Sequence, residues 1–243
     1  MKKFILLFGL IIACSVIYGQ DNRLIYSKNV RDADKRTIEI LRESEAHVSV
    51  NWVGIDVEKI FVSEQFVLQF GEINLTIQKS RIEERGVNNF SFVGKNKEGV
   101  TLVMSVLDGD ILGTLETYGG VYSIRTFGEN EFAVIKSDNS KMKELDVYDE
   151  DMQNPKEFDL TNSFEVVNDG FNFSTVSRNN FDCRIRVLVL YTPAARNFVN
   201  NIHNTILHAV DLSNQSFENS NINYRLELAY AGVNQLYRSK YSD

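Results

Sequence analysis

The sequence contains little cysteine, with two such residues among 243. Cys14 lies in an apolar N-terminal stretch with the features of an export signal, so Cys183 is the one cysteine expected in the mature chain. No disulfide can then form within that chain. An odd cysteine in an exported protein indicates a missing partner or a reactive thiol. A buried unpaired cysteine, by contrast, behaves as a small hydrophobic residue.

The sequence also lacks clustered basic residues. Its formal net charge is −7, and no stripe of lysine and arginine with interleaved aromatic residues runs along it. A nucleic-acid surface needs such clusters, because lysine and arginine replace the counterions of the phosphates. We therefore expect no nucleic-acid partner.

Complete catalytic motifs are missing as well. The sequence has no Gly-x-Ser-x-Gly elbow, no phosphate-binding loop and no Gly-x-Gly-x-x-Gly after a strand. His203 and His208 stand five residues apart on a predicted helix, which turns their side chains about 140° apart. Zinc proteases of the His-Glu-x-x-His type need an i, i+4 spacing and a glutamate after the first histidine, whereas Asn204 follows His203. We expect no catalytic residue and no metal ligand here, with one histidine at the helix rim and the other facing solvent.

Residues 1–19 are predicted to be a signal peptide. Two lysines precede an apolar run, FILLFGLIIA, that is short for a membrane span. Cleavage near residue 20 would release the protein. Alternatively, the IIAC stretch resembles a bacterial lipobox, which would leave Cys14 lipidated and anchored to the membrane. In both cases the rest of the chain is expected to be secreted or otherwise extracytoplasmic.

The segment from about residue 48 to residue 136 has the pattern of short strands. Turn residues separate them, and the Asp-Gly at Asp108 and the Gly-Gly at Gly119 indicate tight hairpins. We predict a β-rich antiparallel domain over residues 20–137. The predicted strands are HVSVNWVGI, IFVSEQFVLQF, EINLTIQKSRIEE, NNFSFVGK, VTLVMSVLDG, DILGTLETY, GVYSIRTFG and NEFAVIKS.

Hydrophobic residues become sparse after this segment. Residues 138–182 are acidic and polar, which predicts a linker whose exposed end lies around Arg178, Asn179 and Asn180. Upstream of the strands, residues 32–46 have the polar pattern of a short surface helix.

A strand–helix–strand pattern begins at Cys183. The nearly continuous apolar run from Ile185 to Leu190 predicts a strand buried on both faces. Thr192 can cap a helix, and Pro193 suits its first position. Apolar residues recur at helical spacing as far as Phe217, and a second strand, INYRLELAYAGV, follows. Because such a unit needs further strands to cover its sheet, residues 183–243 are expected to be the truncated start of a domain, and the chain is predicted to be α+β.

The same C-terminal residues resemble a known family. IRVLVLYTPAAR, followed by HAVDLSNQSFENSNINYRLELAYAGV, is similar to the start of the catalytic domain of bacterial reprolysin-like zinc metalloproteases, which are metzincins. The family's Ser-x-Ile-x-x-x-Leu-x-Leu pattern is matched at Ser220, Ile222, Leu226 and Leu228. Upstream, FSFVGK, VTLVMSVLDGDILGTLET and GGVYSIRTFGENEFAVI resemble the prodomains of these proteins. The resemblance implies a metzincin-like α/β catalytic domain over residues 183–243.

The resemblance further implies the N-terminal portion of a secreted zinc metalloendopeptidase zymogen. The full-length protein would hydrolyse peptide bonds of protein or peptide substrates and would bind zinc. The family's zinc motif, His-Glu-x-x-His-x-x-Gly-x-x-His, lies downstream of the second strand and is absent from this sequence. This chain is therefore expected to bind no zinc and to be inactive by itself. Activation cleavage is expected within residues 170–183, around Arg178, Asn179 and Asn180.

Two questions stay open at this point. Cys183 could pair with a cysteine outside the chain, could act as a thiolate that blocks zinc in a latent form, or could be a free thiol. The chain could also be a non-catalytic exported β-rich protein with a binding or inhibitor-like role, or a lipoprotein anchored through Cys14.

Overall fold

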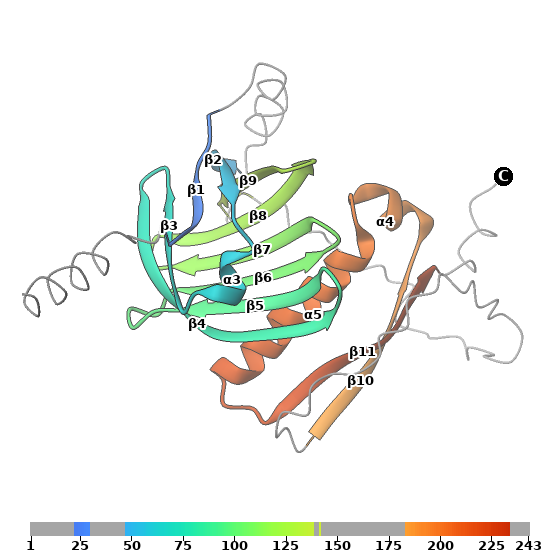
Figure 1. The fold of residues 1–243 in the computed structure, drawn as a ribbon. Helices are drawn as coiled ribbons and strands as arrows, with labels where there is room; N and C mark the ends of the chain where they lie inside the picture. Colours follow the sequence, from blue (N-terminus) through green and yellow to red (C-terminus); the bar gives the residue numbers. More distant parts are fainter. Residues whose placement is uncertain (1–21, 30–46, 139–140, 142–182, 234–243) are drawn as a thin grey trace, which may run out of the picture.

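The computed structural model describes residues 22–29, 47–138, 141 and 183–233. They form a closed barrel and a strand–helix–strand unit, and a long helix of that unit runs along the outer face of the barrel (Figure 1). Within these residues no helix is long and apolar enough to cross a membrane.

Nine strands close the barrel, in the order β1-β2-β9-β8-β7-β6-β5-β4-β3. All neighbours are antiparallel except β1 and β3, which pair in parallel and close the ring. A short helix, α3 (Lys59–Val62), connects β2 to β3. The strands are β1 (Arg23–Ser27), β2 (His47–Ile55), β3 (Gln65–Phe70), β4 (Ile73–Gly86), β5 (Asn89–Lys95), β6 (Thr101–Leu107), β7 (Asp110–Thr117), β8 (Gly120–Gly128) and β9 (Glu131–Ser137).

Large apolar side chains fill the barrel interior. The inward positions of neighbouring strands form one cluster, in which Phe66 and Phe92 meet edge to face with ring centroids 5.3 Å apart. A barrel of this size encloses enough space for side chains to pack against one another. Gly94 and Gly113 leave room for the inward neighbours Ile77 and Ile124, because a Cβ at either glycine would meet those side chains at 2.5 Å and 3.0 Å.

The predicted hairpin at Asp108 is confirmed, because the Asp108–Gly109 turn between β6 and β7 has the two positive φ angles, 50° and 85°, that a tight hairpin requires. The predicted strands of this region are also confirmed, with three differences. The start of the predicted strand IFVSEQFVLQF is instead helix α3. Strand β1 and the closure of the sheet were not predicted.

The C-terminal unit consists of two strands and two helices. β10 (Cys183–Tyr191) and β11 (Tyr224–Val233) pair in parallel. Between them lie α4 (Pro193–Phe198) and α5 (Ile202–Asn219). The Thr192 cap is confirmed, since its hydroxyl accepts a hydrogen bond from the Ala195 amide at 3.1 Å. The single long helix predicted from Thr192 is wrong: it breaks after Phe198, and Asn201 caps a second helix by accepting from the Asn204 amide.

Helix α5 lies between the barrel and the parallel strands. One side contacts the outer faces of β6 and β7, and the other packs on β11. Leu107 of β6 belongs to the apolar cluster of the C-terminal unit, together with Tyr191, Ile206, Leu207, Val210 and Leu228. The barrel therefore supplies part of the core of this unit.

The predicted α+β fold class is wrong. The described chain is mostly β, with a closed nine-stranded barrel and little helix, and it shows no metzincin-like α+β fold. The prediction treated the strand–helix–strand pattern as the start of an independent α/β domain. Within the described residues that unit is a two-stranded sheet and two helices docked on the barrel.

The prediction that the first C-terminal strand is buried on both faces is also wrong. Ile185, Leu188 and Leu190 of β10 are 44%, 58% and 41% exposed. Val187 and Val189 pack against the cluster that contains α5, so Leu188 and Leu190, which alternate with them, lie on the face of the sheet away from the helix.

Candidate functional site

Some of the residues singled out from the sequence lie within the described part of the chain. Cys183 begins β10, where it is exposed and forms no disulfide. Cys14 and the stretch Arg178, Asn179 and Asn180 lie outside the described residues. The roles proposed for all of them stay predictions.

One of the two histidines of α5 does not lie as expected. His203 meets the Tyr191 ring edge to face, with centroids 6.2 Å apart. His208, expected at the rim or in solvent, instead faces the barrel, between Ser105 of β6 and Thr114 of β7. It marks the centre of a polar contact between α5 and the barrel.

Asp211 is the main acceptor of this contact. It is 2% exposed and accepts a hydrogen bond from the Ser105 hydroxyl at 2.6 Å. Both terminal nitrogens of Arg85 on β4 also donate to its carboxylate, one of them at 3.2 Å. Arg85 donates further to the Ser91 hydroxyl at 3.3 Å. A buried carboxylate needs such partners, because leaving it unpaired away from water is costly.

His208 completes the network as a neutral ring. Its Nδ1 lies 3.0 Å from the Ser105 oxygen and its Nε2 3.0 Å from the Thr114 oxygen. The Ser105 proton goes to Asp211, so Nδ1–H donates to Ser105 and Nε2 accepts from Thr114. Burial lowers the pKa of His208 from 6.5 to about 4, although the Asp211 carboxylate acts to raise it. The ring is therefore uncharged at neutral pH.

Ser105, His208 and Asp211 are the residue types of a hydrolytic triad, but they are not arranged as one. In a triad the carboxylate binds the second nitrogen of the histidine and orients it toward the serine. Here Asp211 binds the serine, and Thr114 binds that second nitrogen. Ser105 is fully buried, which leaves no access for a substrate. The cluster joins two parts of the fold and is not a nucleophilic site.

Two asparagines extend the polar contact along α5. The amide nitrogen of Asn204, which is fully buried, donates to the Asp110 carboxylate at 2.7 Å and to the Asp110 carbonyl at 3.0 Å. On the other side, Asn214 pairs with the backbone of Leu226 in β11 at 2.7 Å and 3.0 Å. The helix is thus hydrogen-bonded to both the barrel and the parallel strands.

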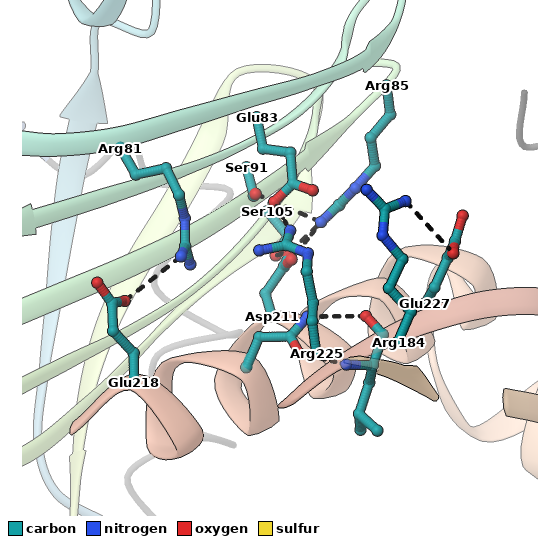
Figure 2. Close-up of polar contacts among 12 residues, drawn as sticks. Arg81, Glu83, Arg85, Ser91, Ser105, Arg184, Asp211, Glu218, Arg225 and Glu227 are labelled. Atoms are coloured by element: carbon teal, nitrogen blue, oxygen red, sulfur yellow. Dashed lines mark hydrogen bonds and ion pairs between the residues drawn. The ribbon is translucent and has the colours of Figure 1, made fainter. Parts of the chain in front are cut away.

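Ion pairs join strand β4 to the C-terminal unit. Figure 2 shows Arg81 directed at Glu218 of α5, at 3.3 Å, and Glu83 lying against Arg225 of β11. The side chains of Glu83 and Arg225 are 8% and 7% exposed. Arg85 pairs with Asp211 in the same way, and Lys95 of β5 lies 3.8 Å from Glu218, so four pairs of opposite charge among the described residues cross between the barrel and the unit.

Sequence reasoning missed this interface, although a signal was present. Asn204, His208, Asp211 and Gln215 follow one another at i, i+4, i+7 and i+11, so they share one face of α5. A polar face on an amphipathic helix ordinarily points to solvent. These four residues point to the barrel instead, and three of them are buried.

The described residues do not fit a catalytic metal. They contain no group of three histidine, cysteine, aspartate or glutamate side chains placed to hold an ion. Both ring nitrogens of His208 are already hydrogen-bonded to hydroxyls. No catalytic step is therefore assigned to these residues.

Comparison with known proteins connects the chain to a peptidase. It is 28% identical over 126 residues to the peptidyl-Asp metalloendopeptidase of Xanthomonas campestris, a match that covers 51% of this chain and 28% of that protein. The similarity suggests a metallopeptidase relationship, and the chain spans less than a third of the length of this relative. No family model matches the chain, and no solved structure matches it.

Proposed function

We propose that this chain is the N-terminal portion of an exported zinc metalloendopeptidase precursor of the reprolysin-like type. The barrel is the propeptide domain, and the unit from β10 to β11 opens the peptidase part. The observation that carries this proposal is the 28% identity to a peptidyl-Asp metalloendopeptidase. The zinc and the groups that activate water would come from residues outside the described part of the chain.

The contact between the barrel and α5 supports a propeptide role. A propeptide has to hold the peptidase part in a defined way until it is removed. The buried network of Asp211, Ser105, Arg85 and His208 makes such a contact, because its hydrogen bonds between helix and barrel form only when α5 lies on the barrel. The predicted cleavage segment around Arg178–Asn180 would lie between the two parts along the chain.

Expression of the complete reading frame that contains this chain tests the proposal. We expect hydrolysis of a protein substrate that a zinc chelator abolishes and added zinc restores. We also expect one bound zinc per active molecule, because a catalytic site of this class holds a single ion. N-terminal sequencing of the active form should begin within residues 170–183.

Two results would contradict parts of this proposal. A complete product without bound metal and without chelator-sensitive hydrolysis would assign the chain to the non-catalytic alternative, an exported binding or inhibitor-like protein. An active enzyme that still begins near residue 20 would exclude the activation step. Mass spectrometry of that N-terminus would also show whether Cys14 carries lipid.

A further inference from the structure

Strand β4 carries a row of alternating charge on the outside of the barrel. Arg81, Glu83 and Arg85 occupy every second position, so they share one face of the strand. We call these three residues the β4 charge row. Their partners carry the complementary signs: Glu218, Arg225 and Asp211.

A bulge in β4 places the row on this face. Earlier in the strand, Ile73, Leu75 and Ile77 belong to the interior cluster, so odd-numbered positions point inward. The register shifts between Lys79 and Arg81. A bulge adds one residue to one strand and so exchanges its two faces. Beyond it Ile82 packs inward and the odd-numbered charges point outward.

The row is matched by two separate elements of the C-terminal unit. Glu218 and Asp211 come from α5, and Arg225 comes from β11. The sign pattern is therefore satisfied only when helix and strand have their relative positions in the unit (Figure 2). A displacement that brought like charges together, or left one charge buried and unpaired, would be strongly disfavoured.

Burial makes the pattern selective. Glu83 and Arg225 are both shielded from water, and Asp211 is almost completely buried. Salt screens such pairs much less than it screens exposed ones. Apolar contacts at Leu107 and the hydrogen bonds of Asn204 add to the same interface.

We propose that the β4 charge row is a recognition surface for the α5–β11 unit of this chain, and that it keeps the barrel bound to that unit after the connecting segment is cut. The inference deepens the proposed function, on which its biological meaning rests: the cleaved propeptide stays on the enzyme until a further event removes it. The physical claim concerns the association of two parts and needs no peptidase activity.

The experiment cuts the whole chain at one place. A recognition sequence for a site-specific protease is inserted within residues 142–182 of the full chain, and the protein is cleaved after folding. Gel filtration and native mass spectrometry then follow the two pieces. We expect them to remain together at about 0.1 M salt. A measurable fraction of the complexes should dissociate only when the salt concentration approaches about 1 M. Pieces that separate at low salt while each keeps its circular dichroism would overturn the proposal.

Charge exchange tests the recognition itself. Glu83→Arg and Arg225→Glu should each weaken the association of the cut pieces by tenfold or more, since each places like charges together in a buried site. The variant that carries both substitutions again has opposite charges at the two positions, with their places exchanged. It should regain most of the affinity between the cut pieces. A double variant as weak as the single ones would exclude charge recognition at this pair.

Two further variants keep the test decisive if a buried charge exchange prevents folding. Glu218 is 43% exposed, so Glu218→Lys should fold and should weaken association by roughly threefold to fivefold, the range of a partly exposed pair. Glu227→Lys is the matched control, because Glu227 pairs with Arg184 inside the C-terminal unit, at 3.7 Å. It should leave the association unchanged. Equal effects of the two variants would overturn the proposal.

These outcomes are separate from those of the peptidase assay. Pieces that stay associated by charge, in a complete protein without chelator-sensitive hydrolysis, would support the recognition surface and contradict the peptidase proposal. Pieces that separate, in an active zinc enzyme, would do the reverse.

Discussion

The barrel and the C-terminal unit differ in how the edges of their sheets are paired within the described residues. In the barrel every strand has two neighbours, because β1 pairs with both β2 and β3 and closes the ring. Closure removes the free edges that otherwise invite association. The β10–β11 sheet has two strands within the described residues, and β10 leaves large apolar side chains exposed.

The two regions also differ in where their cores come from. The barrel interior is built from its own strands and α3. The smaller cluster around α5 includes Leu107 of the barrel, and Asn204, His208 and Asp211 on the polar face of α5 form hydrogen bonds with barrel residues. The comparison shows that the C-terminal unit depends on the barrel, whereas the barrel interior does not depend on the unit.

Removal of an aromatic ring from the barrel interior should give the largest loss in the free energy of unfolding. It tests whether the barrel is stabilised by its own interior cluster. Phe92 is fully buried and packs on Phe66. Phe92→Ala should lower the free energy of unfolding by about 3–5 kcal/mol, through lost burial and the cavity left behind. Urea unfolding followed by circular dichroism measures it. Tyr118→Ala is the control, because Tyr118 is 90% exposed and its loss should cost under about 0.5 kcal/mol.

A similar cost for the two variants would contradict the assignment of the interior cluster as the main source of stability. A large effect of Phe92→Ala on the barrel should also loosen α5, because the outer face of β6 holds the helix.

The sequence predicts well those features that neighbouring residues determine. Alternation identifies β2 to β9, the Asp108–Gly109 pair identifies a hairpin, and Thr192 with Pro193 identifies a helix start. In each case the residues that form the feature lie within a few positions of one another, so tertiary contacts are not needed to specify it.

Features that depend on distant residues were missed. The five-residue β1 has too little pattern of its own, and its two partners lie far along the chain at β2 and β3. The α5 face with Asn204, His208 and Asp211 looks like a solvated face until Ser105, Thr114 and Asp110 are placed opposite. The bulge that turns Arg81 and Arg85 outward shows in the sequence only as a change of the apolar positions from odd to even numbers between Ile77 and Ile82.

A substitution at Asp211 should weaken the contact that holds the C-terminal unit on the barrel. Asp211→Asn removes the charge that neutralises Arg85 and weakens three hydrogen bonds. We expect a loss of about 3 kcal/mol, because a buried guanidinium is left without its counter-charge. The loss should appear as earlier unfolding of the region from β10 to β11, measured by amide hydrogen exchange.

Glu218→Gln is the matched control for Asp211→Asn. It removes an acidic residue from the same helix at a more exposed pair, so it should cost under about 1 kcal/mol. Comparable losses in the two variants would mean that burial of the Asp211 network adds nothing to the docking of α5.

Acid should loosen the same contact through His208. Its pKa is lowered to about 4 in the folded chain and would be near 6.5 when unfolded. Between these values the unfolded state binds more protons, so stability is present above pH 6.5 and is lost as the pH falls toward 4. The lowering of this pKa from 6.5 to about 4 corresponds to roughly 3 kcal/mol, at about 1.4 kcal/mol per pKa unit. The barrel groups facing the ring, Ser105 and Thr114, are uncharged hydroxyls, whereas Asp211 lies on the same helix and is paired with Arg85.

His208→Gln isolates this contribution. Glutamine can still bond to one of the hydroxyls but does not titrate, so the fall in stability between pH 6.5 and 4 should become shallower. Urea unfolding midpoints at half-unit pH steps measure the slope. An unchanged slope would show that His208 is not the group that responds to acid.

The smallest change in stability is expected at the exposed side of the β10–β11 sheet. Leu188 is 58% exposed, so Leu188→Thr should change the free energy of unfolding by under about 1 kcal/mol. It should still reduce self-association, because exposed apolar side chains on an open strand favour contact between copies. Light scattering across a concentration series measures this. Val87→Thr, at an isolated exposed position in a barrel turn, is the control, and an equal reduction there would remove the contrast between the closed and the open sheet.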